Sequence, residues 1–106
     1  METPQVKVCS GADGTVVVVC CGEFDLDTSG VLAAACAREG AGAALVVVDV
    51  ARVTFADSAF LNVLIRLRNS RPLALAGPLP NQLRRLLEMT GALALFEIRD
   101  GTGRTG

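Results

Sequence analysis

Two short segments of the chain carry the residue types that could do chemistry. The first is Asp57-Ser58 in the stretch FADSAFL, where a carboxylate and a hydroxyl precede a long apolar run. A serine at a helix start accepts a hydrogen bond from a free backbone N–H, which stabilises the helix by about 1 kcal/mol. One interpretation is therefore that Ser58 is the N-cap of the helix that follows.

The same position also suits a phosphate group on Ser58. Free N–H groups and the helix dipole favour negative charge at a helix start. A phosphoserine would carry about −1.5 to −2 charges and would change the surface that a partner protein reads. The cap and the phosphoacceptor are compatible interpretations, because a capping serine keeps its hydroxyl.

The second segment is GEFDLDT, residues 22–28. Gly22, Glu23 and Asp25 fall at the carboxyl end of a predicted strand, and a helix is predicted to follow. Ligand sites in open α/β sheets gather at such strand ends. Asp57 lies at another strand-to-helix junction, so this topology allows Asp25 to approach Ser58. The alternative is that these acids only cap the first helix.

Several kinds of catalytic and metal site are disfavoured by what the chain contains. It has no histidine, and histidine is the commonest general base near neutral pH. No C-x-x-C spacing occurs, and adjacent Cys20 and Cys21 point to opposite faces of a strand. We expect Cys9, Cys20, Cys21 and Cys36 to be buried and reduced. Without a glycine-rich phosphate loop either, we expect no enzyme, no metal and no cofactor.

Charge and hydropathy restrict the partners. Ten basic residues against eleven acidic ones give a net charge of −1, which predicts no direct nucleic-acid binding. No apolar run approaches the roughly 18 residues that span a bilayer. The start METPQVKVCSG lacks the apolar region of a signal peptide, so we expect a cytoplasmic protein without membrane insertion.

Residue periodicity predicts the elements that must position the two segments. Strands are expected at QVKVC, VVVVCCGEF, ALVVVDV, PLALA and ALFEIR, and helices within DLDTSGVLAAACAREG, SAFLNVLIRLRNSR and NQLRRLLEMTG. Asp27, Thr28 or Ser29 is expected to start the first helix, with Gly40 ending it and Gly91 ending the third. The order β-β-α-β-α-β-α-β predicts an α/β fold, a mixed sheet packed with helices. We expect one domain over residues 1–106, with a core at 5–99 and a disordered tail at 100–106.

The second predicted helix is amphipathic. Its polar face carries Ser58, Asn62, Arg66 and Asn69, and its apolar face carries Phe60, Val63, Leu64 and Leu67. Leu61 and Ile65 flank the polar stripe, so we expect them at the edge of any docking surface.

Three blocks of the sequence resemble a known family. CCGEFDLDTSGVL, LVVVDVARVTFADSAFLNVLIRL and PLPNQLRRLLEMTGALALFEI look like the anti-sigma factor antagonists of bacteria, single-domain members of the STAS family. The likeness runs from about Val16 to Arg99 and implies the STAS fold, with the element order given above.

The resemblance also implies a function. Such antagonists bind an anti-sigma factor that is also a serine kinase of the GHKL type, and this binding releases a sigma factor. The kinase phosphorylates the serine that directly follows an aspartate at the start of the second helix, which here is Ser58 after Asp57. A serine phosphatase reverses the reaction. Asp25, Glu23 and Gly22 match the family's strand-end segment beside the phosphosite.

One part of the motif departs from the family. Asp-Ser is usually followed by Ser or Thr, then Gly, whereas here Ala59 and Phe60 follow. Ser58 is thus the only hydroxyl left in the motif. We expect the partner to contact Ala59, Phe60, Leu61, Asn62, Ile65 and Arg66. The departure also fits an alternative function, a non-phosphorylated STAS adaptor subunit of a signalling or membrane-transport complex.

Overall fold

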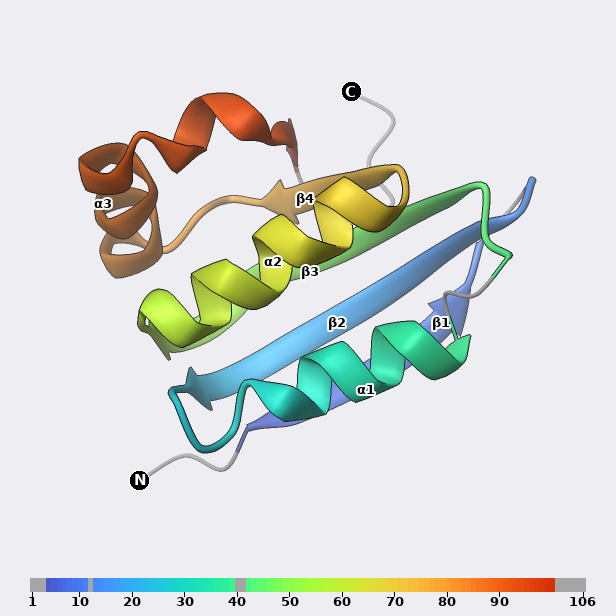
Figure 1. The fold of residues 1–106 in the computed structure, drawn as a ribbon, viewed down its shortest axis with the longest axis horizontal. Helices are drawn as coiled ribbons and strands as arrows, with labels where there is room; N and C mark the ends of the chain where they lie inside the picture. The colour runs from blue at the N-terminus through green and yellow to red at the C-terminus, as the bar shows by residue number, and fades with distance from the viewer. Residues whose placement is uncertain (1–3, 12, 40–41, 101–106) are drawn as a thin grey trace.

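The computed structural model describes residues 4–11, 13–39 and 42–100. Five strands form one sheet in the order β1-β2-β3-β4-β5 (Figure 1). The elements in chain order are β1 Gln5–Ser10, β2 Thr15–Phe24, α1 Gly30–Glu39, β3 Leu45–Ala56, α2 Ser58–Ser70, β4 Leu73–Gly77, α3 Asn81–Thr90, the 3₁₀ helix η1 Ala92–Leu95 and β5 Glu97–Asp100. The predicted α/β class, element order and mixed sheet are confirmed.

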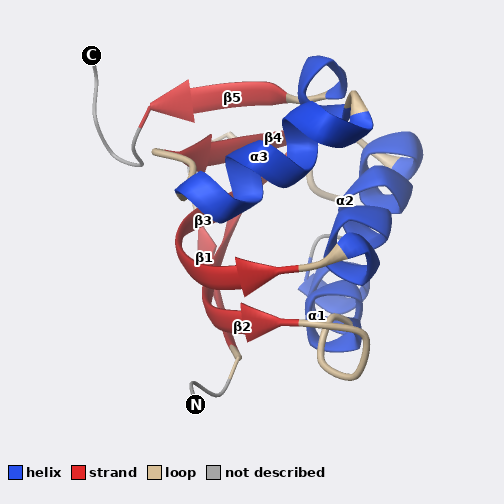
Figure 2. Ribbon diagram, turned by 90° about the vertical axis from the view of Figure 1, so that its left-hand side faces the viewer, coloured by secondary structure: helices blue, strands red, loops and turns tan. Residues whose placement is uncertain are grey.

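The sheet begins with an antiparallel hairpin and continues with parallel strands. β1 pairs antiparallel with β2, and each of the pairs β2–β3, β3–β4 and β4–β5 is parallel. Asp13 and Gly14 turn the hairpin with φ of 58° and 79°, values typical of an Asp-Gly hairpin turn. The helices α1 and α2 lie on the same face of the sheet, and α3 crosses near the carboxyl ends of the strands (Figure 2).

Two predicted boundaries are wrong. The third strand was expected to end at Val50, but β3 continues to Ala56, because pairing with β2 persists through two register shifts to Phe24↔Ala56. The predicted strand ALFEIR is divided between η1 and β5, and Asp100 belongs to β5 rather than to the tail. Gly40 and residues 101–106 lie outside the described residues, so the expected helix stop and disordered tail are not tested.

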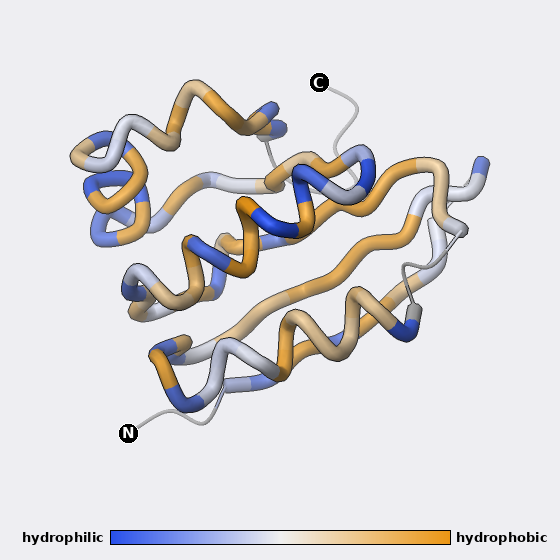
Figure 3. Tube along the Cα trace, viewed as in Figure 1, coloured by the Kyte–Doolittle hydropathy of each residue, from blue (hydrophilic) through white to orange (hydrophobic). Residues whose placement is uncertain are grey.

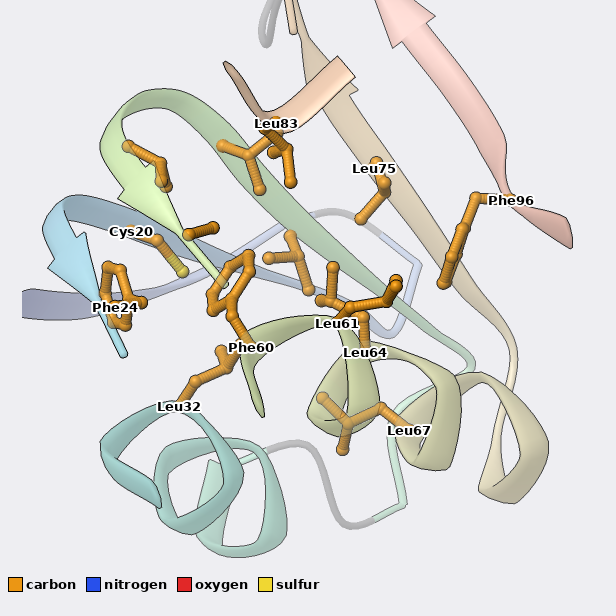
Figure 4. Packing of buried hydrophobic residues seen from close by; sticks show 14 of the residues in the cluster. Cys20, Phe24, Leu32, Phe60, Leu61, Leu64, Leu67, Leu75, Leu83 and Phe96 are labelled. Atoms are coloured by element: carbon orange, nitrogen blue, oxygen red, sulfur yellow. The ribbon is translucent and has the colours of Figure 1, made fainter. Parts of the chain in front are cut away.

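The hydrophobic core lies between the sheet and the helices. Alternate residues of β2 point inward, so Val18, Cys20 and Phe24 are fully buried. The helices contribute Leu32, Phe60, Leu61, Leu64, Leu67 and Leu83 to the same core cluster (Figure 4). Along α2, apolar residues recur with the period of a helix and polar residues lie between them (Figure 3). This pattern confirms the predicted amphipathic helix.

The cysteines differ from one another. Cys20 and Cys36 are buried, Cys21 is half-buried and Cys9 is exposed, and all four are free thiols. The expectation that all four are buried is therefore right for two of them. Cys9 is exposed because it faces outward on the edge strand β1. Burial raises the pKa of the Cys20 and Cys36 thiols, so both stay protonated near neutral pH.

Candidate functional site

The register of β2 and β3 brings the two candidate segments together. Phe24 and Ala56 are partners in the parallel pair, so Asp25 and Asp57 leave the sheet side by side at its carboxyl edge. The backbone N–H of Asp57 donates a hydrogen bond to the carbonyl of Phe24 over 3.2 Å. The expectation that the Asp25 segment approaches the Asp57-Ser58 junction is confirmed at the level of the backbone.

Gly22 lies at a register shift between β2 and β3 just before this edge, where the extra residue belongs to β3. Its φ is +94°, a conformation that side-chain-bearing residues rarely adopt. One of the two register shifts against β3 falls between Gly22 and Glu23. The glycine therefore lets the strand continue to Phe24 and deliver Asp25 to the edge.

Asp25 organises the turn that leads into α1. Its Oδ1 accepts hydrogen bonds from the N–H of Asp27 at 3.0 Å, the N–H of Thr28 at 3.1 Å and the hydroxyl of Thr28 at 2.9 Å. In return, the N–H of Asp25 donates to the Thr28 hydroxyl oxygen at 2.9 Å. These bonds end at Thr28, before α1 begins at Gly30, so the alternative that these acids cap the first helix is not confirmed. The role that the structure shows for Asp25 is to hold the turn before the helix. It does not exclude a second role, because Oδ2 has no hydrogen-bond donor among the described residues.

The N-cap of α2 is Asp57, not Ser58 as the sequence suggested. Its Oδ1 accepts from the N–H of Ala59 at 2.9 Å and of Phe60 at 3.4 Å, and its backbone is extended. A carboxylate suits this position because it complements the positive end of the helix dipole. Ser58 is instead the first helical residue and is exposed, and its hydroxyl forms no hydrogen bond with any described residue.

Two residues expected at the partner surface lie in the interior. Phe60 is fully buried, and its ring stands 5.0 Å from the ring of Phe24 between centroids. Leu61 is 4% exposed. The expectation that Phe60 and Leu61 contact a partner is therefore wrong for this structure. The cause is the placement of α2, whose apolar stripe is wide enough to turn both residues toward the core.

The remaining helix face is smaller and more polar than expected. Asn62 and Arg66 are exposed, and Ala59 and Ile65 are half-buried beside them. Together with Ser58, these side chains form the accessible face of α2, so they are the helix residues that a partner can reach directly.

Sequence reasoning missed two exposed apolar residues at this edge. Leu26, next to Asp25, is 81% exposed, and Phe55, two residues before Asp57, is 41% exposed. Exposed large apolar side chains near a polar rim are common in protein interfaces. The sequence did indicate exposure of Leu26, since it stands between Asp25 and Asp27. The outward direction of Phe55 could not be predicted, because it depends on the register shifts in β3.

Gln82 of α3 is a third residue that the sequence did not single out. Its Oε1 accepts from the N–H of Ala56 at 2.8 Å, and its Nε2 donates to the carbonyl of Ala56 at 2.7 Å. This amide therefore contacts the backbone immediately before Asp57-Ser58. No sequence pattern indicates it, because the two residues are 26 positions apart.

The described residues contain no group of three or more His, Cys, Asp or Glu side chains that could hold a metal ion. Within the same residues, no helix is both long enough and apolar enough to cross a membrane.

Solved structures share this fold. An anti-sigma factor antagonist from Mycobacterium paratuberculosis matches with a TM-score of 0.81 and 24% identity, over 92% of this chain and 86% of that one. The anti-sigma factor antagonist SpoIIAA in its unphosphorylated form matches with a TM-score of 0.74 and 19% identity, over 93% and 90%. The phosphorylated form of the Bacillus cell fate determinant SpoIIAA matches with a TM-score of 0.69 and 18% identity, over 93% of each chain.

No curated protein sequence matches the chain at a significant level. A family model does match, over residues 9–97, and its description is "Mlab, STAS domain". This span contains both segments of the candidate site and most of the described chain. The strand order, the Asp57-Ser58 junction and this match agree, and the chain belongs to the STAS-domain family.

Proposed function

We propose that the protein is an anti-sigma factor antagonist that is switched off by phosphorylation of Ser58. In the unmodified state it binds an anti-sigma factor that is also a serine kinase of the GHKL type, and the sigma factor is released. The observation that carries this proposal is the exposed hydroxyl of Ser58 in the first turn of α2, directly after the capping Asp57; it forms no hydrogen bond with the described residues. The similarity of the fold to solved anti-sigma factor antagonists supports it.

The docking surface is formed by the accessible face of α2 and the neighbouring strand ends. Leu26 and Phe55 supply exposed apolar area near the strand ends. Interfaces of this kind take most of their affinity from a few apolar anchors inside a polar rim. The residues proposed to contact the partner are Leu26, Phe55, Ser58, Ala59, Asn62, Ile65 and Arg66.

Phosphorylation acts on this surface through charge. The N–H groups of Ala59 and Phe60 already bind Asp57, so they are not free to neutralise a phosphate on Ser58. The added charge of about −1.5 to −2 stays at the surface next to Asp57, at the same sheet edge as Asp25. A partner that desolvates this position is repelled and loses its contact with the hydroxyl. A change of about 3 kcal/mol would weaken binding more than a hundredfold.

In this proposal the chain is a substrate of enzymes and not an enzyme. The kinase binds ATP and transfers its γ-phosphoryl group to the oxygen of Ser58. The bond to the γ-phosphorus breaks and ADP leaves, while a base of the kinase takes the hydroxyl proton. A serine phosphatase removes the group and restores the binding surface. No chemistry is assigned to Asp25 or Asp57, which shape the acceptor and set the local charge.

The test uses an anti-sigma kinase encoded near the gene. Binding of the purified kinase to this protein is titrated without nucleotide, then after incubation with ATP and magnesium. We expect tight binding first and loss of binding together with a single added phosphoryl group. A kinase that neither binds nor modifies the protein would contradict the proposal.

The departure at Ala59 and Phe60 favours one second candidate, a non-phosphorylated adaptor subunit of a signalling or membrane-transport complex. Affinity capture separates the two functions. Recovery of a transporter's ATPase subunit, with Ser58 unmodified after incubation with ATP, would establish the adaptor.

A further inference from the structure

The carboxyl half of β3 lacks a strand neighbour on the side of β4. The described pairing between β3 and β4 runs from Val46↔Leu73 to Asp49↔Ala76, but β3 continues to Ala56. On its other side, β3 stays paired with β2 as far as Phe24↔Ala56. The last residues of β3 are therefore held by the sheet on one edge only.

Gln82 fills the missing place beside Ala56. A residue in a strand directs its N–H and C=O to the same side, and the Gln82 amide presents one acceptor and one donor to that pair, at 2.8 and 2.7 Å. The side chain thereby imitates the peptide group of an absent strand. Both bonds are partly buried, so water does not replace them freely.

The next residue is held from the opposite side. The N–H of Asp57 donates to the carbonyl of Phe24 on β2, and the carboxylate of Asp57 then caps α2. The junction from which Ser58 projects thus lies between β2 and α3. On the α3 side, the Gln82 amide makes the only side-chain hydrogen bonds to Ala56 among the residues that the structure describes.

We infer that Gln82 is a positioning residue, which fixes the β3–α2 junction and so couples the start of α3 to the Ser58 site. The biological role of this coupling rests on the proposed function, in which Ser58 is the group that the kinase modifies. The helix α3 itself does not depend on Gln82, since Leu83 and Leu87 are fully buried and anchor it to the core. Loss of the amide therefore loosens the junction without releasing the helix.

The test is amide hydrogen exchange, measured by NMR on the free protein. Gln82→Met keeps the length of the side chain and removes both hydrogen bonds. We expect the amides of Ala56, Ala59 and Phe60 to exchange about tenfold faster, as the loss of two hydrogen bonds implies. The amide of Val18 in the core reports global unfolding and should change much less. Arg85→Met, on an exposed position of the same helix, is the matched control and should leave all four amides unchanged.

Gln82→Glu adds a signature that a general loss of packing cannot produce. Its ionised carboxylate would accept from the N–H of Ala56 but repel the carbonyl, whereas the protonated acid would bind both. Protection of Ala59 and Phe60, relative to the wild type at the same pH, should therefore recover as the pH falls through the usual carboxyl range near 4.3. No such recovery is expected for Gln82→Met.

Three results would overturn the inference. They are a change confined to Ala56, an equal change at Val18 and Phe60, or a Gln82→Met variant that exchanges like Arg85→Met. Each outcome is read without a kinase, so failure to phosphorylate Ser58 would count against the proposed function and not against the role of Gln82.

Discussion

The ring of Phe60 packs against the ring of Phe24 at the carboxyl edge of the sheet, with centroids 5.0 Å apart and planes inclined by 41°. Both side chains are fully buried. The family resemblance leads us to expect glycine at this position, and the phenylalanine found there adds to the core rather than to the docking surface. The helix start that presents Ser58 is thereby fastened to the end of β2, the strand that delivers Asp25.

Phe60→Ala should lower the free energy of unfolding by about 3–5 kcal/mol, because it removes a fully buried aromatic ring and leaves a cavity. Urea denaturation followed by circular dichroism measures the change. Phe55→Ala is the matched control, since that ring is 41% exposed and should cost much less. Equal losses in the two variants would show that the Phe24–Phe60 contact is not the reason.

Asp57→Ala should destabilise the protein by about 1 kcal/mol through loss of the N-cap of α2. Asp57→Asn keeps an oxygen that accepts from Ala59 and Phe60, so most of that stability should remain. Thermal and urea unfolding of the two variants measure the difference. A greater loss for Ser58→Ala than for Asp57→Ala would restore Ser58 as the cap.

Ser58→Ala should abolish phosphoryl transfer by a cognate kinase, because Ser58 carries the only hydroxyl in the motif. Its stability should stay within about 0.5 kcal/mol of wild type, since that hydroxyl forms no hydrogen bond with the described residues. Intact-mass spectrometry after incubation with ATP gives the answer. Thr54→Ala, which removes an exposed hydroxyl on β3, should still gain one phosphoryl group.

Ser58→Asp should weaken binding to the anti-sigma factor by about tenfold or more, because one permanent negative charge is placed beside Asp57. Ser58→Asn has nearly the same shape without the charge and should bind more tightly than Ser58→Asp. Isothermal titration calorimetry at two salt concentrations measures the affinity of each variant. The difference between the two affinities should become smaller at high salt, because salt screens the added charge. Equal affinities for the two variants would rule out the charge mechanism.

The buried thiols predict how stability depends on alkaline pH. Burial raises the pKa of Cys20 and Cys36 above the ordinary value of 9.0, so the unfolded chain releases these protons before the folded one does. The contribution of these two thiols to the free energy of unfolding is therefore fully present below pH 9, and it is lost as the pH rises above 9. Urea unfolding between pH 8 and 10 should show this slope. Cys20→Ala should reduce the slope, because it removes one of the two buried thiols.

Local sequence determined much of this protein. Period-two and helical apolar patterns predicted the elements and their order, and Asp13-Gly14 and Gly91 ended elements for reasons of backbone conformation. The placement of Asp25 and Asp57 at neighbouring strand ends followed from parallel pairing, which brings carboxyl ends to one edge. These features depend on a few adjacent residues or on general topology, so a single sequence contains them.

The tertiary structure decided the rest. Asp57 and Ser58 are both good caps, and only the extension of β3 to Ala56 sets which of them meets the N–H groups of Ala59 and Phe60. The burial of Leu61 follows from the packing of α2 against the core, and the Gln82–Ala56 contact follows from the position of α3 near the end of β3. Each of these depends on packing between segments far apart in the chain, which residue periodicity does not encode.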